Sequence, residues 1–79
     1  MSAEYFIRRQ DKLRTLLAEK KVDGMLITNL IHIKYLCGFG GSSGSLLMGP
    51  DTCEFITDGR YVVQSKNEVR GANITIDSI

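Results

Sequence analysis

The stretch "CGFGGSSG" at residues 37–44 contains four glycines and two serines. The segment before it, "LIHIKYL" (30–36), reads as a short helix, and it follows Asn29, a residue type that caps helix N-termini. The segment after it, "SLLM" (45–48), has the length and apolar character of a strand. The glycine-rich stretch is therefore expected to be a loop that leads from a helix to a strand.

The rest of the chain continues as alternating helices and strands. Apolar spacing predicts a helix over 3–20, a strand over 25–28, a strand over 53–57, a helix over 60–70 and a strand over 74–79. "GPDT" at 49–52 is typical of a tight turn, so the strands on either side of it should form a hairpin. A hairpin followed by a helical crossover predicts an α/β fold with a mixed sheet and helices on its faces.

The same patterns predict which side chains are buried. The first helix is expected to begin after a Ser2 cap, and Gly24 is expected to take a positive φ where the chain leaves it. The continuous apolar run at 25–28 is typical of a strand buried on both faces. The side chains expected to face the core from the two longer helices are Phe6, Leu13, Leu16, Leu17, Tyr61, Val62, Ser65 and Val69.

The composition is that of one small globular domain. Of 79 residues, 43% are apolar and 24% are charged, and the net charge is +1. Because the charges are spread along the chain, neither a nucleic acid nor a membrane surface is indicated as a partner. The N-terminus is charged and lacks the apolar stretch of a signal peptide, so we expect a cytoplasmic protein. The chain ends on an apolar strand with nothing after it to cover that strand, so we expect a truncated domain.

Few residues of this chain are suited to bind a metal. His32 is the only histidine, whereas a catalytic zinc site needs three protein ligands. The cysteines, Cys37 and Cys53, are too far apart in the sequence for a C-x-x-C pair. We therefore expect no metal site and no catalytic residue, with His32 on the surface or partly buried. The cysteines are expected to be buried thiols, with a disulfide between them as the alternative.

The glycine-rich loop matches one catalytic pattern formally. Residues 40–44 satisfy G-x-S-x-G, which would make Ser42 the nucleophile of a serine hydrolase. That motif requires a turn from strand to helix and a histidine later in the chain, but here a helix precedes the loop and His32 lies before it. A dinucleotide fingerprint fails because Ser43 stands where a glycine is needed, and no G-K-[ST] of a P-loop occurs.

A second motif, "TDGRY" at 57–61, contains two charged residues with different interpretations. Asp58 suits the N-cap of the following helix. Arg60 lies in the first turn, where a cation opposes the helix dipole by about 0.3–1 kcal/mol, so stability does not explain its position. It would suit a substrate carboxylate, and an exposed arginine with no role is the alternative. The aromatic residues expected to pack in the core or at its rim are Tyr35, Phe39 and Tyr61.

Together the two motifs resemble the N-terminal domain of the creatinase, aminopeptidase P and prolidase family. The family pattern Y-L-x-G-F-x-G-S-x-G is matched by Tyr35, Leu36, Gly38, Phe39, Gly41, Ser42 and Gly44. The pattern T-D-G-R-Y-x-x-Q-A is matched by residues 57–61 and Gln64, with Ser65 in place of the alanine. The resemblance covers essentially the whole chain, and the T-D-G-R-Y form is most similar to Xaa-Pro aminopeptidases.

The resemblance implies a ribonuclease H-like, three-layer α/β/α domain with a mixed sheet, of which residues 1–79 form a part. It also implies a parent metallopeptidase that removes the residue preceding proline. Its two divalent metal ions, taken to be manganese, would be held by a pita-bread catalytic domain absent from this chain. This N-terminal domain would contact that catalytic domain, make homo-oligomer contacts and form part of the wall around a proline-containing peptide. The residues implied to contact or line the substrate site are Arg60, Phe39, Gly41, Ser42 and Ser43.

Two alternatives accompany this interpretation. The first is an inactive peptidase-like module that binds proteins, and such a module would be expected to have lost Arg60 and the loop serine, which are both present. The second is prolidase or creatinase specificity on the same fold, which the loop sequence does not separate from aminopeptidase specificity.

Overall fold

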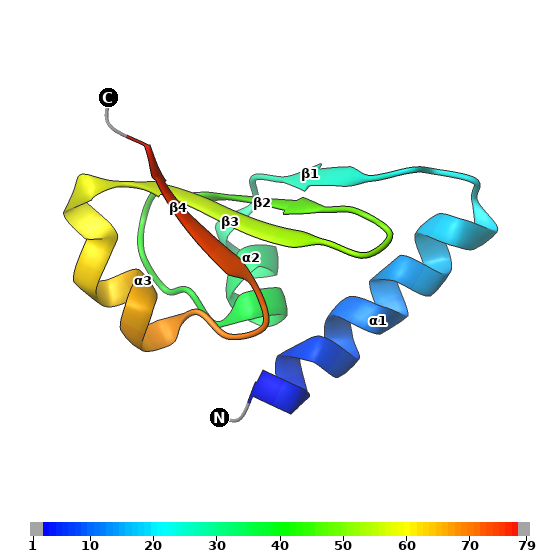
Figure 1. The fold of residues 1–79 in the computed structure, drawn as a ribbon, viewed down its shortest axis with the longest axis horizontal. Helices are drawn as coiled ribbons and strands as arrows, with labels where there is room; N and C mark the ends of the chain where they lie inside the picture. Colours follow the sequence, from blue (N-terminus) through cyan, green and yellow to red (C-terminus); the bar gives the residue numbers. More distant parts are fainter. Residues whose placement is uncertain (1–2, 78–79) are drawn as a thin grey trace.

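A four-stranded sheet organises the chain, and its three α-helices lie on one side of it (Figure 1). The computed structural model describes residues 3–77. In chain order the elements are α1 (Ala3–Glu19), β1 (Met25–Ile27), α2 (Leu30–Cys37), β2 (Ser45–Met48), β3 (Cys53–Asp58), the 3-10 helix η1 (Gly59–Tyr61), α3 (Val62–Glu68) and β4 (Asn73–Asp77).

The sheet is mixed, as predicted. Its strand order is β1-β2-β3-β4, in which β1 with β2 and β2 with β3 are antiparallel, whereas β3 with β4 is parallel. The tight turn closes where the Gly49 backbone N–H donates to the Thr52 carbonyl over 2.9 Å. The parallel strand β4 is reached through η1 and α3, which together make the crossover that parallel strands require.

The core lies between the sheet and the helices. Strand alternation directs Leu46, Met48 and Phe55 to the helical side, where all three are fully buried. The helices and the glycine-rich loop contribute the other half of this core, namely Ile33, Leu36, Cys37, Phe39 and Val69. The predicted α/β class with a mixed sheet is thus confirmed.

The opposite face of the sheet carries no helix among residues 3–77. Leu26 and Leu47, paired across β1 and β2 on this face, are 60% and 43% exposed. The described residues therefore supply two layers of the predicted three-layer arrangement. The prediction that the strand at 25–28 is buried on both faces is wrong for this chain, because β1 is an edge strand with one uncovered face.

Helix α1 packs mainly through its N-terminal half. Phe6 and Gln10 are buried, and the Gln10 side-chain amide donates to the Leu36 carbonyl of α2 over 2.9 Å. Leu13 packs against the core as predicted, but Leu16 is 47% exposed, so that part of the predicted stripe is wrong. Leu16 borders the edge strand β1, beyond which no described residue covers it.

The helix ends follow local chemistry with a few corrections. Asn29 accepts from two backbone N–H groups at the start of α2, and Gly38 ends that helix with a φ of 91°, both as predicted. At the end of α1 the positive φ belongs to Lys21 rather than to Gly24. The predicted helix at 60–70 is shorter, because it begins as η1 and ends at Glu68.

The chain termini limit two further comparisons. The predicted Ser2 cap and the last two residues of the predicted strand at 74–79 lie outside the described residues. Within the part that is described, β4 shows the expected alternation, since Ile74 and Ile76 are half-buried whereas Thr75 is exposed. No helix in residues 3–77 has the length and apolar character needed to cross a bilayer.

Candidate functional site: the glycine loop and the TDGRY segment

The two sequence motifs meet in the structure. We call residues 38–44 the glycine loop and residues 57–61 the TDGRY segment. The Thr57 hydroxyl donates to the Ser43 carbonyl over 2.7 Å. The Ser42 backbone N–H donates to the Tyr61 phenolic oxygen over 3.3 Å, and the Ser42 and Tyr61 hydroxyls share a short hydrogen bond. These contacts join two segments far apart in the sequence into one surface unit.

Aromatic rings support this unit from inside. Phe39 is 1% exposed, and its ring centroid lies 4.5 Å from that of Phe55 and 5.3 Å from that of Tyr61, the latter edge to face. Phe39 therefore packs as the aromatic prediction expects. Its ring faces the protein interior in this structure, so it supports the loop rather than lining an open cleft.

The glycines of the loop are explained by these rings. A Cβ on Gly41 would lie 2.9 Å from Tyr61 Cε1 and closer still to the Phe39 ring. A Cβ on Gly44 would lie 2.9 Å from the Phe55 ring. Such separations are too short for carbon atoms, so the loop can follow this path only where side chains are absent. The glycines thus allow the backbone to lie against aromatic rings, which is a structural role and not that of a phosphate cradle.

Asp58 and Arg60 form an ion pair beside the glycine loop. One Asp58 carboxylate oxygen accepts from the Arg60 backbone N–H (3.0 Å) and from its Nε (2.9 Å), and the other accepts from Nη2 (2.8 Å). The predicted capping role of Asp58 is confirmed at the start of η1. These bonds from Arg60 lower the pKa of Asp58 to about 2, and the carboxylate in turn raises the pKa of Arg60.

The outer edge of Arg60 stays accessible. Its side chain is 67% exposed, and its Nη1 atom has no hydrogen-bond partner among residues 3–77. A guanidinium held on one edge by Asp58 can still donate from its other edge to a carboxylate or carbonyl. Beside it, the hydroxyl and backbone N–H of Ser42 lower the pKa of Tyr61, because both bonds favour the phenolate.

The structure places the predicted substrate-site residues in different environments. Ser42 and Arg60 are exposed, Gly41 and Ser43 are half-buried, and Phe39 is buried. Sequence reasoning missed Glu68, whose carboxylate accepts from the Gly40 backbone N–H (2.8 Å) and from the Gln64 amide (3.1 Å). The glutamine of the longer T-D-G-R-Y-x-x-Q pattern was the available signal, since Gln64 and Glu68 are one helical turn apart.

The described residues offer no site for a metal ion. No group of three or more His, Cys, Asp or Glu side chains lies close enough within residues 3–77 to hold one, and His32 is exposed on α2. The resemblance assigns its two metal ions to the catalytic domain and not to these residues. Cys37 and Cys53 are buried free thiols, as predicted, and burial raises the pKa of both, that of Cys53 to about 11.

Comparison with known proteins identifies the family. The chain belongs to the Creatinase/Prolidase N-terminal domain family, which matches residues 9–78. It is 44% identical over 64 residues to YqhT of Bacillus subtilis, described as an uncharacterized peptidase, and this alignment covers 81% of the chain.

Solved structures agree with this assignment. An Xaa-Pro aminopeptidase from Streptococcus pyogenes superimposes with a TM-score of 0.86 at 30% identity, over 94% of this chain and 57% of that one. An Xaa-Pro dipeptidase from Bacillus anthracis gives a TM-score of 0.86 at 32% identity, over 91% of this chain and 20% of that one. The chain also spans only 18% of the length of YqhT, so these relatives contain much that this chain does not.

Proposed function

We propose that this chain is the N-terminal, non-catalytic part of an Xaa-Pro-specific metallopeptidase and that its paired loops form part of the substrate-site wall. The observation that supports the proposal is the hydrogen-bonded union of the glycine loop with the TDGRY segment, in which Tyr61 bonds to Ser42 and the guanidinium carbon of the exposed Arg60 lies 5.2 Å from the Tyr61 ring centroid. In this arrangement Asp58 fixes the guanidinium, and Arg60 donates to a carboxylate or carbonyl of the peptide.

The chemistry of hydrolysis belongs to the catalytic domain of the complete enzyme. We propose two divalent metal ions there, with manganese as the first choice, and removal of the residue that precedes proline. Support comes from family membership and from the Xaa-Pro aminopeptidase and dipeptidase structures that this chain resembles. The present residues would shape the entrance, orient the peptide and contact the catalytic domain of the same chain.

A peptidase assay on the complete enzyme tests this proposal. The substrates are an Xaa-Pro-Xaa tripeptide, an Xaa-Pro dipeptide and creatine, each with and without manganese. Metal-dependent release of the first residue of the tripeptide is the expected result. Cleavage of the dipeptide alone would assign prolidase specificity to the enzyme instead of aminopeptidase specificity. Turnover of creatine would assign creatinase specificity. No hydrolysis by folded, metal-loaded protein would overturn the proposal in favour of a peptidase-like recognition module.

Two further predictions concern the oligomeric state and the cellular location of the complete enzyme. Homo-oligomer contacts are tested by sedimentation of the complete enzyme, for which a mass of at least two chains is expected. Cytoplasmic location is tested by fractionation of the cells that produce it, where the enzyme should appear with the cytoplasmic fraction.

A further inference from the structure

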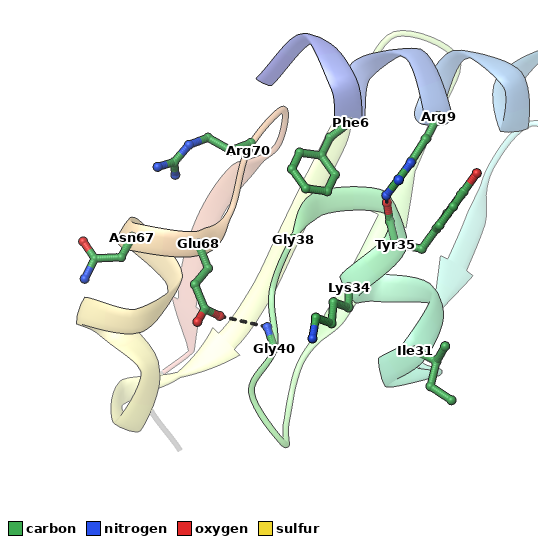
Figure 2. Close-up of a pocket in the computed structure, with 10 residues that line it drawn as sticks. All are labelled: Phe6, Arg9, Ile31, Lys34, Tyr35, Gly38, Gly40, Asn67, Glu68 and Arg70. Carbon is green, nitrogen blue, oxygen red and sulfur yellow. Dashed lines mark hydrogen bonds between the residues drawn. The ribbon is translucent and has the colours of Figure 1, made fainter. Parts of the chain in front are cut away.

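A groove separates α1 and α2 from the end of α3. It has a volume of about 700 Å³, and Phe6, Arg9, Lys34, Gly40, Glu68 and Arg70 are among its lining residues (Figure 2). We call it the basic groove. It lies on the side of the glycine loop that faces α1 and α2, and it includes neither Arg60 nor Ser42.

The groove carries a net positive charge, whereas the rest of the chain carries a small net negative one. Its lining includes three cationic side chains and one carboxylate, so its net charge is +2. These residues are Arg9, Lys34, Arg70 and Glu68. The remaining side chains carry seven positive and eight negative charges. None of the three groove cations forms an ion pair within residues 3–77.

The single carboxylate of the groove is already bonded. Glu68 accepts hydrogen bonds from the Gly40 backbone N–H and from Gln64, so its Oε1 atom is held against the glycine loop. It therefore ties α3 to the glycine loop, and it forms no ion pair with the three cations. An incoming anion would meet three cations that have no carboxylate partner within residues 3–77, although Arg70 Nη1 already donates to the Val69 carbonyl over 2.9 Å.

Arg9 is held in place before any ligand arrives. Its guanidinium carbon lies 4.0 Å from the ring centroid of Tyr5 and 4.1 Å from that of Tyr35, so it sits between two aromatic rings. Its Nη1 also donates to the Tyr35 carbonyl over 2.8 Å. A cation with a fixed position loses little conformational entropy on binding, which favours a recognition role.

The arrangement of the cations distinguishes an extended ligand from a single small anion. Figure 2 shows Arg9 and Lys34 on the α1–α2 side and Arg70 on the opposite wall, with a side chain that extends away from the other two. Their charged ends do not converge on one point. A phosphate ion would pair with one or two of them, whereas a peptide with successive carboxylates can reach all three. The apolar surface of the groove comes from Ile31 and Tyr35, which are 79% and 53% exposed, because Phe6 is buried.

We propose that the basic groove is a docking site for an acidic peptide segment of a partner protein. Carboxylates of that segment pair with Lys34, Arg9 and Arg70, and an apolar side chain of the segment packs on the exposed Ile31. The volume lies within the range of about 300–1,000 Å³ that is usual for ligand sites. This site is independent of the proposed peptidase function, and its test needs no hydrolysis.

The test is an NMR titration of the ¹⁵N-labelled chain with a hexapeptide of alternating Glu and Leu. We expect saturable shifts of the Gly38 and Gly40 amides at low salt. Raising the salt from about 20 mM to about 200 mM should weaken binding severalfold, because it shortens the Debye length. A peptide with Lys in place of Glu should give no shifts. Equal shifts from both peptides, or the same shifts from inorganic phosphate at equal concentration, would overturn the proposal.

Charge variants assign the binding to the groove. Lys34→Glu should weaken binding by about fivefold, since it replaces an exposed attraction by a repulsion. Lys20→Glu makes the same charge change at the far end of α1 and should leave binding unchanged. Lys34→Gln, which only removes the charge, is the second variant should the reversal disturb folding, and it should weaken binding less. Equal affinities for the wild type and both Lys34 variants would contradict the assignment.

Discussion

Gly41 is held between two aromatic rings, so its lack of a side chain is a condition of the fold. In Gly41→Ala the new methyl group would overlap Phe39 and lie 2.9 Å from Tyr61 Cε1. We expect a loss of about 1–3 kcal/mol in the free energy of unfolding, as for other overpacked sites. Urea denaturation measures it.

Gly59 provides the matched control for this prediction. A Cβ at Gly59 would meet no atom within 4 Å. Gly59→Ala should therefore be neutral, or stabilise the chain by up to about 1 kcal/mol, because alanine restricts the unfolded state. Similar losses in the two variants would show that the rings do not set the path of the loop.

The Asp58–Arg60 ion pair makes the free energy of unfolding depend on pH. Its hydrogen bonds lower the pKa of Asp58 from 3.8 to about 2 in the folded chain. A lowered folded-state pKa means that the pair stabilises the fold at pH values above about 4, and that this contribution disappears as the pH falls toward 2. Carboxyl ¹³C NMR should give a midpoint near 2 for Asp58.

Arg60→Gln is the control for this titration. It removes the guanidinium but keeps the backbone N–H that also donates to Asp58. The midpoint should rise toward 3.8 without reaching it. An Asp58 titration midpoint near 3.8 in the wild type would show that the ion pair with Arg60 does not form.

Helix α2 depends on a local cap that the sequence already indicated. Asn29 accepts from the backbone N–H groups of Ile31 and His32 over 2.9 and 3.2 Å. Asn29→Ala should cost about 1 kcal/mol in unfolding free energy. Asn67→Ala, at an exposed position within α3, should be neutral or slightly stabilising because alanine favours helices. Thermal denaturation followed by circular dichroism compares them, and an unaffected Asn29 variant would count against the cap.

Elements set by local chemistry were predictable from the sequence. The cap at Asn29, the glycine exit at Gly38 and the strand at 45–48 all depend on neighbouring residues, and the structure confirms them. The predicted burial of Leu16 and Leu26 was wrong. An apolar pattern indicates which side chains can be buried, but it does not show whether another part of the chain covers them. The predicted packing of Phe39 is confirmed, but the sequence could not name its partners, because its contacts with Phe55 and Tyr61 join three separate segments.

The candidate site shows the same division. Its two motifs and the capping role of Asp58 were readable in the sequence, because both follow from residue types at fixed spacing. The bonds from Thr57 to Ser43 and from Gly40 to Glu68 depend on how the segments pack in three dimensions. No spacing rule predicts them.

Within residues 3–77 one face of the sheet is covered by helices and the other is open, which predicts unequal responses to mutation on the two faces. Leu46 and Leu47 are adjacent on β2, but Leu46 is 0% exposed and Leu47 is 43% exposed. Leu46→Ala should cost about 2–5 kcal/mol in unfolding free energy. Leu47→Thr should stay within about 0.5 kcal/mol of the wild type, as expected for surface changes. Urea denaturation of both variants measures the difference, and equal losses would mean that both faces are covered.

We propose that Arg60 contacts the substrate in the complete enzyme. The measurement is kcat/KM on an Xaa-Pro-Xaa tripeptide for the wild type, Arg60→Ala and the control Arg8→Ala, which removes an exposed arginine paired with Glu4 over 3.7 Å. Since hydrogen bonds to charged groups contribute about 1.5–3 kcal/mol, Arg60→Ala should lower kcat/KM by about tenfold or more. Arg8→Ala should leave it unchanged, and both variants should unfold at the temperature of the wild type to within a few degrees. An Arg60→Ala enzyme with the kcat/KM of the wild type would contradict the claim.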